Sequence, residues 1–481
     1  MARTTDPKDY GFVGDMQPIT VEQLLGLTDG IICGDVNPTA QIHGCAIDTR
    51  SMHSGDAFFA LPGSHQHGVD FAEVAVRCGA SVVVVDRAVS DRCPVPHVQV
   101  GSSLATLSMA ARQNRRQSQA LVIGVTGSVG KTTTRQMIAA ALGTEFTGIQ
   151  SPRNFNNQLG VPLSLLELQP DDEFAVIEIA ASAPGEIRRL AAVAEPEFAV
   201  VTRVAPAHLR GFGSLQGVQK EKRTLVESLP TEGVAFLNAD DPLVLQMATM
   251  SPARVVTFGF GNSADVRATD AVHTEDGFEF LVDGHPYQLH VCGSHNITNA
   301  LAAIAIGQEI GLTCDQIAAG LNEFRSPAGR CRLTQIGEWQ VIDDSYNSSP
   351  ASMTAAIRAL EETAGCHHRV AVVGDMLDLG EQSQDLHYGM GATLAAANID
   401  HVAVLGNFAG DLADGYLDAG GSLNRISVFS DMNLMVSMLE CLLSTDDAVL
   451  VKGSRGMQME RVISHLNSLC SHDSTSTLRA A

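Results

Sequence analysis

The residue types best suited to chemistry occur in residues 120–143. There an apolar run precedes the motif Thr-Gly-Ser-Val-Gly-Lys-Thr-Thr and an apolar-patterned segment. This order predicts a buried strand, a tight loop and a helix whose N-terminal N–H groups face phosphates, with Lys131 reaching the outer phosphates and Thr132 holding Mg²⁺. Val125 stands where the standard spacing has a glycine, but the strand, loop and helix context favours nucleotide binding over an incidental turn. The predicted phosphate cradle comprises Thr126, Gly127, Ser128, Val129, Gly130, Lys131, Thr132 and Thr133.

A carboxylate interrupts the next predicted strand. Residues 174–180 read as a buried strand, and Glu178 lies near its carboxyl end. A buried carboxylate is costly unless it is paired or bound to metal, and ligands of open α/β sheets gather at the carboxyl ends of strands. A structural ion pair is the alternative, but the neighbouring phosphate loop favours a Mg²⁺ ligand.

A histidine and a lysine follow the strand predicted at residues 197–204. His208 lies in the loop after that strand, where it would approach Glu178 and the phosphates. In the helix predicted at residues 214–229, Lys222 shares the inward face of Val218 and Leu225, whereas Lys220 does not. An inward lysine should have a lowered pKa and a reactive neutral amine. The alternative is that its stem is buried while its ammonium reaches a carboxylate.

Further polar groups occur at predicted strand and helix ends. Ser294 is expected to cap a helix whose first turns carry Asn296 and Asn299, which would serve as caps or contact a nucleotide base. In the last third of the chain, residues 343–347 and 452–455 follow predicted strands and should face one cleft.

The composition limits the classes of function. The 481 residues carry a formal charge of −23, with 45% hydrophobic and 18% charged residues, which describes a globular enzyme and disfavours nucleic acid and anionic membranes as partners. The ten scattered cysteines suggest a reducing compartment. The first residues lack the apolar core of a signal peptide, and no run approaches a membrane span, so we expect a soluble cytoplasmic protein.

The order of strand and helix patterns predicts an α/β chain of three domains. Residues 18–114 would form a small N-terminal α/β domain, residues 118–327 a central phosphate-loop ATPase domain with a parallel sheet, and residues 328–468 a Rossmann-like domain. The tail at residues 469–481, rich in Ser and Thr, is expected to be disordered.

Four motifs together resemble the Mur ligase family, and the resemblance runs from about residue 48 to residue 460. They lie at residues 154–162, 207–214, 343–347 and 452–455. The resemblance implies an ATP-dependent, ADP-forming ligase of peptidoglycan precursor synthesis. Such an enzyme would join D-alanyl-D-alanine to UDP-N-acetylmuramoyl-tripeptide through an acyl phosphate and would act as a monomer.

The resemblance also implies roles for single residues. Thr132 and Glu178 would hold one Mg²⁺, and His208 with a carbamylated Lys222 would position a second. Lys131, Lys222 and His208 would be the catalytic residues. The other implied contacts are Asn296 and Asn299 to adenine, Arg330 to the phosphates and Asp344 to the ribose. The implied substrate contacts are Asp48, Thr49 and Arg50 near the UDP group, and Asn156, Asn157, Asn347 and Lys452 elsewhere in the cleft.

Two departures from the family pattern affect the peptide contacts. Residues 180–186 differ from the usual Gly-x-Asn-His-x-Gly-Glu, and Arg210 stands where a glutamate is usual. The nearest alternative is the ligase that adds a diamino acid, but residues 405–408 lack its Asp-Asn-Pro-Arg motif. A folylpolyglutamate synthase-like ligase would lack the segment at residues 48–50. A nucleotide-switched binding module or motor ATPase would explain the phosphate loop but leave Lys222 and the third domain unexplained.

Overall fold

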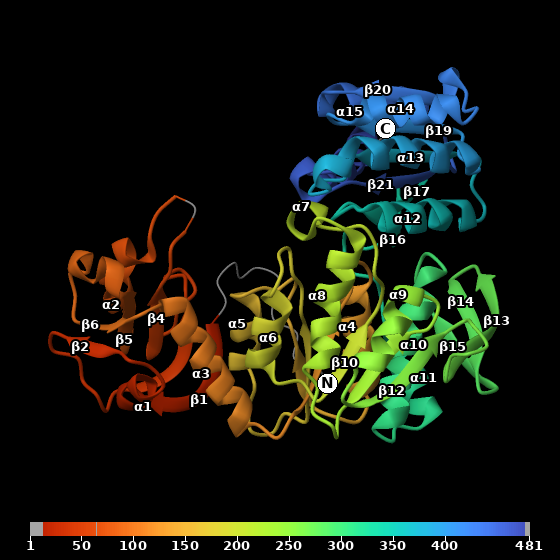
Figure 1. Ribbon diagram of the computed structural model, residues 1–481. Helices are drawn as coiled ribbons and strands as arrows, with labels where there is room; N and C mark the ends of the chain where they lie inside the picture. The colour runs from red at the N-terminus through yellow and green to blue at the C-terminus, as the bar shows by residue number, and fades with distance from the viewer. Residues whose placement is uncertain (1–12, 64, 477–481) are drawn as a thin grey trace.

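The computed structural model describes residues 13–63 and 65–476, in which three β-sheets follow one another along the chain (Figure 1). We call the segment from β1 to α3 the first part, from β7 to α11 the central part, and from residue 328 to the end of α16 the third part. In Figure 1 the first part lies on the left, the central part below and the third part above it. The predicted α/β fold class is confirmed.

The first sheet has the order β1-β3-β4-β5-β6-β2, with parallel pairing from β3 to β6 and antiparallel strands at both edges. Its strands are β1 (Val13–Thr20), β2 (Ile31–Cys33), β3 (Gln41–Ala46), β4 (Asp56–Ala60), β5 (Val82–Asp86) and β6 (His97–Val100). Its helices are α1 (Val21–Gly26), α2 (Ala72–Arg77) and α3 (Ser103–Gln117). The four consecutive valines of β5 are all buried, which suits a strand covered on both faces.

The central sheet has nine strands in the order β15-β14-β13-β12-β11-β10-β7-β9-β8. It is parallel from β8 to β13, and an antiparallel meander, β13 to β15, extends it. The strands are β7 (Leu121–Thr126), β8 (Gly148–Gln150), β9 (Phe174–Glu178), β10 (Phe198–Val201), β11 (Val234–Asn238), β12 (Arg254–Gly259), β13 (Val266–Thr274), β14 (Gly277–Val282) and β15 (His285–Leu289). The helices are α4 (Lys131–Leu142), α5 (Gly160–Leu166), α6 (Glu186–Ala194), α7 (Leu209–Phe212), α8 (Leu215–Glu227), α9 (Pro242–Leu245), α10 (His295–Glu309) and α11 (Cys314–Glu323).

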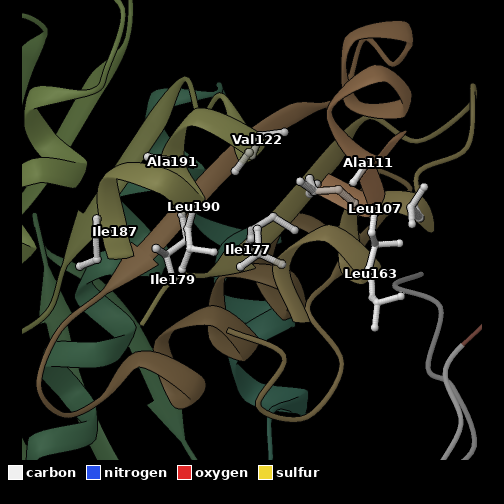
Figure 2. Close-up of a cluster of buried hydrophobic side chains, with 14 of the residues drawn as sticks. Leu107, Ala111, Val122, Leu163, Ile177, Ile179, Ile187, Leu190 and Ala191 are labelled. Carbon is white, nitrogen blue, oxygen red and sulfur yellow. The ribbon is translucent and has the colours of Figure 1, made fainter. Parts of the chain in front are cut away.

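The first and central parts share one apolar core. Leu107 of α3, Leu163 of α5 and Ile177 of β9 belong to a single buried cluster that also contains Phe59 of β4 (Figure 2). The other face of the central sheet packs on α4, α10 and α11 through a separate cluster. Because the apolar residues of the first and central parts are contiguous, these two parts are packed as one body.

A buried amide strengthens this junction. The Asn114 Nδ2 group in α3 donates hydrogen bonds to the carbonyl oxygens of Leu165 and Leu168, at 2.9 and 3.1 Å. These carbonyls lie at the end of α5, where the helix itself provides no donors. Asn114 therefore caps α5 from a helix of the first part.

The third sheet has the order β16-β17-β21-β18-β19-β20 and is parallel except at β16. Its strands are β16 (Arg332–Ile336), β17 (Trp339–Asp344), β18 (Arg369–Gly374), β19 (His401–Leu405), β20 (Ile426–Phe429) and β21 (Ala448–Lys452). Its helices are α12 (Pro350–Glu362), α13 (Ser383–Ala396), α14 (Ala409–Asp418), α15 (Met432–Leu442) and α16 (Glu460–Ser476). Two buried clusters, one on each face of the sheet, form its core.

The predicted disorder of residues 469–481 is wrong for residues 469–476, because α16 continues to Ser476. Leu466 is fully buried, and Leu469 and Cys470 pack against the same apolar cluster, so the helix is anchored as far as Cys470. Residues 477–481 lie outside the described residues.

Helices α13 and α14 approach each other closely at Gly391. A Cβ atom at this position would lie 2.0 Å from the Leu412 carbonyl oxygen, whereas one at Gly389 in the same helix would meet nothing within 4 Å. We expect Gly391→Ala to lower the free energy of unfolding by about 1–3 kcal/mol through overpacking. The control Gly389→Ala should raise it by about 0.5–1 kcal/mol, because alanine favours helix. Urea unfolding would measure both changes, and equal stability of the two variants would contradict the packing described here.

Candidate active site

A cleft of about 1420 Å³ lies where loops after the central strands meet loops after β17, β18 and β21. Residues of α3 and α6 extend it toward the first part. The predicted site residues that line it are Ser128, Val129, Gly130, Lys131, Thr132, Thr133, Asn156, Asn157, Glu178, His208, Asn296, Asn299, Arg330, Asp344, Asn347 and Lys452. The predicted residues outside its lining are Asp48, Thr49, Arg50, Thr126, Gly127 and Lys222.

The phosphate loop connects β7 to α4, and hydrogen bonds to residues that follow β10 stabilise it. The Thr202 hydroxyl donates to the Val129 carbonyl at 2.6 Å, and the Ser128 N–H donates to the Arg203 carbonyl at 2.7 Å. A Cβ atom at Gly127 would lie 1.9 Å from Thr202 Oγ1, and Gly130 has a φ of 84°. The loop therefore requires both glycines, one for close approach and one for a left-handed backbone.

Glu178 lies at the carboxyl end of β9 directly beside this loop and is 1% exposed. Its carboxylate accepts hydrogen bonds from Thr132 Oγ1 at 2.9 Å and from Asn156 Nδ2 at 2.8 Å. The Arg135 Nε atom lies 3.6 Å away, so an ion pair, the alternative to a metal role, is also present. Burial lowers the pKa of Lys131, and Glu178 opposes that effect.

Thr132 and Glu178 offer one hydroxyl and one carboxylate oxygen at the loop. This donor set fits Mg²⁺, which is usually held by one or two protein ligands together with phosphate oxygens and water. Within residues 13–63 and 65–476, no group of three or more His, Cys, Asp or Glu side chains could hold a metal ion. A site built wholly of such side chains is therefore not found there, and the nucleotide would have to supply ligands.

Arg330 connects the third part to the phosphate loop. Its Nη2 group donates to Thr132 Oγ1 at 3.4 Å, and its guanidinium carbon lies 4.0 Å from the centroid of the Tyr346 ring. The ring fixes the cation by a cation–π contact. A positive charge from the third part thus lies beside the phosphate loop, as a nucleotide site requires.

Lys222 is buried in α8, with 4% of the residue exposed. Burial lowers its pKa well below the usual value, and the nearby charge of Lys131 lowers it further. The adjacent Glu221 accepts hydrogen bonds from the Gly185 and Ile187 N–H groups, both at 2.7 Å, and so caps α6. The charge of Glu221 opposes the lowering of the Lys222 pKa, but no ion pair of Lys222 with a carboxylate within 4 Å is found in the described part of the chain.

His208 precedes α7 and has a left-handed backbone, with a φ of 51°. Its Nδ1 atom lies 3.8 Å from an Asp378 carboxylate oxygen of the third part. Burial lowers the pKa of His208, as do Lys131 and Lys222, whereas Asp378 raises it. His208, Lys131 and Lys222 therefore lie close enough to interact electrostatically.

The amides of Asn296 and Asn299 are largely satisfied within the protein. Asn299 Nδ2 donates to Asn296 Oδ1 at 2.9 Å, and Asn299 Oδ1 accepts from Thr134 at 3.1 Å. Asn296 Nδ2 donates to the Cys292 carbonyl at 2.8 Å. Both residues line the cleft, and their contact with adenine stays a prediction.

Ser294 does not cap α10, which corrects the sequence-based prediction. Its backbone is helical, and its side chain makes no capping bond. Its hydroxyl donates instead to Glu362 of α12 at 2.6 Å, and its N–H donates to the same carboxylate at 3.0 Å. The serine therefore links the central and third parts.

Asp344 and Lys452 are partners in adjacent parallel strands. Lys452 Nζ donates to Asp344 Oδ2 at 2.5 Å and to the Asn347 carbonyl at 2.9 Å. Asp344 Oδ1 accepts from the Cys331 N–H at 3.0 Å. The buried Lys452 therefore stabilises the loop after β17. The predicted contacts of Asp344 with ribose and of Asn347 and Lys452 with substrate stay predictions.

Of the other predicted substrate residues, Asn157 lines the cleft, whereas residues 48–50 lie outside its lining. Asn157 Oδ1 accepts from the Leu159 and Gly160 N–H groups, both at 3.0 Å, and so shapes the turn before α5. The Arg50 side chain, 82% exposed, pairs with Asp48 at 2.5 Å outside the cleft. The structure therefore shows residues 48–50 as a surface turn with an ion pair, and their contact with UDP stays a prediction.

Among the residues of this site that were not predicted, Thr202, Tyr346 and Asp378 line the cleft, and Arg135 is buried beside Glu178. Arg135 follows Lys131 by one helical turn, which was the available signal for a second buried cation. Thr202 and Asp378 follow the carboxyl ends of β10 and β18. Because ligands of open α/β sheets bind at such ends, the positions of both residues could have been predicted. Tyr346 gave no signal for its contact with Arg330, because that contact joins two loops.

Comparison with known proteins gives matches along most of the chain. Residues 41–115 match the Mur ligase family catalytic domain, residues 125–307 the Mur ligase middle domain and residues 329–455 the Mur ligase glutamate ligase domain. Relatives named UDP-N-acetylmuramoyl-tripeptide--D-alanyl-D-alanine ligase from Bacillus subtilis and Escherichia coli are 33% and 36% identical, covering 93% of this chain and 98% of each relative. The chain belongs to the Mur ligase family.

Solved Mur ligase structures agree with this assignment. The crystal structure I of MurF from Acinetobacter baumannii is 29% identical with a TM-score of 0.87, covering 94% of this chain and 100% of that chain. The MurF ligase from Thermotoga maritima in complex with ADP is 28% identical with a TM-score of 0.79, covering 89% of this chain and 98% of that chain. The predicted family is therefore confirmed.

The metal assignment can be tested by replacing Glu178 with Gln, which keeps the shape but removes the charge. We expect Mg²⁺ to increase the affinity of the parent protein for ADP. In the variant this increase should be smaller by a factor of at least about ten, because one anionic ligand is lost. Isothermal titration with and without Mg²⁺ would measure the difference. Glu227→Gln is the control, since Glu227 pairs with Arg223 on the surface of α8. An unchanged Mg²⁺ effect in Glu178→Gln would contradict the assignment.

Proposed function

We propose that this Mur ligase joins D-alanyl-D-alanine to UDP-N-acetylmuramoyl-tripeptide and converts ATP to ADP and phosphate. Identity of 33–36% over 93% of the chain to relatives with that name supports the substrates. The observation that carries the chemistry is the single cleft in which the phosphate loop faces Arg330 of the third part. Nucleotide-linked precursors and ATP are cytoplasmic metabolites, so the enzyme would act in the cytoplasm, as a monomer.

The reaction must turn a carboxylate into an acyl donor. An oxygen of the tripeptide carboxylate attacks the γ-phosphorus of ATP, the bond to the bridging oxygen breaks, and ADP leaves. The amine nitrogen of the dipeptide then attacks the acyl carbon, phosphate leaves with the C–O electron pair, and the nitrogen gives up its extra proton. Two anions meet in the first step, so the site has to supply positive charge.

Side chains of the cleft would supply that charge. Lys131 and Arg330 would contact the phosphates from opposite walls, and Arg135 would hold Glu178 in place. Thr132 and Glu178 would hold Mg²⁺, which when bound offsets the charge of the transferring phosphoryl group. Asn296 and Asn299 would face adenine, and Asp344 the ribose.

Lys222 would act as a carbamate, and with His208 it would position a second Mg²⁺. A lysine of lowered pKa presents more neutral amine, which is the form that adds CO₂. Addition would form a bond between Nζ and the carbon of CO₂ and release one proton from the nitrogen to water. The carbamate would carry a negative charge that Lys131 would stabilise. The burial of Lys222 and its freedom from ion pairs in the described residues support this role.

The first part, residues 18–114, would bind the UDP group, with Asp48, Thr49 and Arg50 nearby. The cleft reaches the first part at α3, where Ser102, Ser108 and Arg112 line it. The peptide would extend from there past Asn156 and Asn157 toward Asn347 and Lys452. This path follows the lining of the cleft from the first part to the third.

The substrates can be tested with the purified protein. We expect ADP release only when UDP-N-acetylmuramoyl-tripeptide and D-alanyl-D-alanine are both present, because the acyl phosphate needs an acceptor for turnover. A coupled assay for ADP would measure this. Equal or faster turnover with a free diamino acid and the dipeptide-stage precursor would instead indicate the ligase of the preceding step.

Carbamylation gives a separate test. After equilibration with ¹³C-bicarbonate, we expect a carbamate signal in the NMR spectrum that Lys222→Ala loses and Lys220→Ala keeps. Because the pKa of Lys222 is lowered, its neutral fraction, and with it the carbamate, should be present at a lower pH than for an exposed lysine. Ligase activity should follow the same pattern in the two variants. A signal that persists in Lys222→Ala would contradict the proposal.

A further inference from the structure

Six acidic residues line the cleft in the described part of the chain. They are Glu178, Glu186, Asp240, Asp241, Asp344 and Asp378. A cleft that gathers phosphates should hold few free carboxylates, because each would repel the nucleotide. The hydrogen bonds of these six side chains therefore show which of them remain available to a ligand.

Two of the six accept hydrogen bonds from side chains already described. Glu178 accepts from Thr132 and Asn156, and Asp344 accepts from Lys452. The hydrogen bonds within the protein therefore occupy both carboxylates.

Three more of the six carboxylates accept hydrogen bonds from backbone N–H groups. Glu186 accepts from the N–H groups of residues 182 and 183, at 2.7 and 3.1 Å. Asp240 accepts from those of residues 260 and 261, at 2.8 and 2.9 Å. Asp241 accepts from those of residues 204 and 243, at 2.7 and 2.9 Å. These carboxylates shape loops and are not free to bind a cation strongly.

Asp378 differs from the other five. Its side chain is 62% exposed, and its one ionic contact is with His208 Nδ1 at 3.8 Å, which is longer than a hydrogen bond. Among the six cleft carboxylates of the described chain, it alone accepts no hydrogen bond from the protein. It lies on the third-part wall, opposite the central residues His208 and Lys131.

The loop that carries Asp378 is held firmly. The Met376 N–H donates to His387 Nε2 at 2.9 Å, and the Leu377 N–H donates to Ser454 Oγ at 2.8 Å. The Asp378 carbonyl accepts from the Arg210 N–H of the central part at 3.2 Å. Asp378 has a φ of 62°, a left-handed conformation that is uncommon for a non-glycine residue and that marks functional sites when the surroundings enforce it.

We propose that the Asp378 carboxylate binds the ammonium group of the incoming amine substrate. The inference rests on the proposed function, in which a zwitterionic dipeptide enters beside an activated carboxylate. An ammonium group forms charge-assisted hydrogen bonds with a carboxylate, and Asp378 is the cleft carboxylate that the protein leaves open to one. Its place beside His208 brings the ammonium close to the wall where the acyl phosphate would form, and the ammonium gives one proton to water before its nitrogen attacks the acyl carbon.

The test compares Asp378→Asn with the parent ligase. We expect the KM for D-alanyl-D-alanine to rise about 10–100-fold, as for loss of a hydrogen bond to a charged group. The KM values for ATP and the UDP-linked tripeptide should stay within about twofold, because these substrates contact other walls. Asp378→Glu should restore part of the affinity. The control is Asp385→Asn, since Asp385 is exposed in the first turn of α13 and lies outside the cleft lining.

A second readout isolates the ammonium. N-propionyl-D-alanine replaces the amine of the dipeptide with hydrogen, and its inhibition constant against D-alanyl-D-alanine measures binding without that charge. We expect Asp378→Asn to leave this constant unchanged. Equal weakening of dipeptide and analogue, an unchanged KM for the dipeptide, or an equal rise in all three KM values would overturn the inference while the ligase function stands. If the parent protein shows no turnover with the dipeptide, the proposed function fails, and the inference fails with it.

Discussion

The crowding of positive charge around one buried carboxylate is the constraint on which the site depends. The half-buried Lys131 and the buried Arg135 lie within reach of Glu178, and Arg330 approaches the same point from the third part. In a chain of formal charge −23, these cations are concentrated where phosphates would lie. The cost of burying them is offset by Glu178 and by hydrogen bonds, and a polyphosphate would offset it further.

This charge can be concentrated because two sheets present their carboxyl ends to the same space. The central sheet supplies the phosphate loop and Glu178, and the third sheet supplies Asp344, Lys452 and Asp378. Contacts between polar groups fix the two sheets relative to each other: Arg330 with Thr132, Ser294 with Glu362, and Arg210 with Asp378. An acceptor on one wall and an activated donor on the other is the arrangement that joining two substrates requires.

Much of this was predictable from local pattern. The strand, loop and helix at residues 120–143, the inward lysine at Lys222 and the strand-end carboxylate Glu178 each follow from periodicity and spacing. Contacts between distant loops were not predictable. The Ser294 hydroxyl has no sequence signal that separates a cap from a bond to Glu362, and a Ser/Thr-rich end suggests disorder unless the apolar contacts of Leu469 and Cys470 are known. The free carboxylate of Asp378 is visible only once the partners of the other five are known.

The junction made by Asn114 and the shared apolar cluster has a mechanical consequence. Separating the first part from the central part would expose leucines and leave the last carbonyls of α5 without donors, so these two walls of the cleft move together. The seam along the third part is largely made of polar contacts that water can replace, with Leu386 packing against apolar residues on both sides. The chain passes from the central part to the third part through residues 325–331, where Gly329 and Cys331 both have left-handed backbones, so any change in the width of the cleft would turn about this segment. Such a change would leave the phosphate loop, Thr132 and Glu178 in the same geometry, because all three belong to the central part.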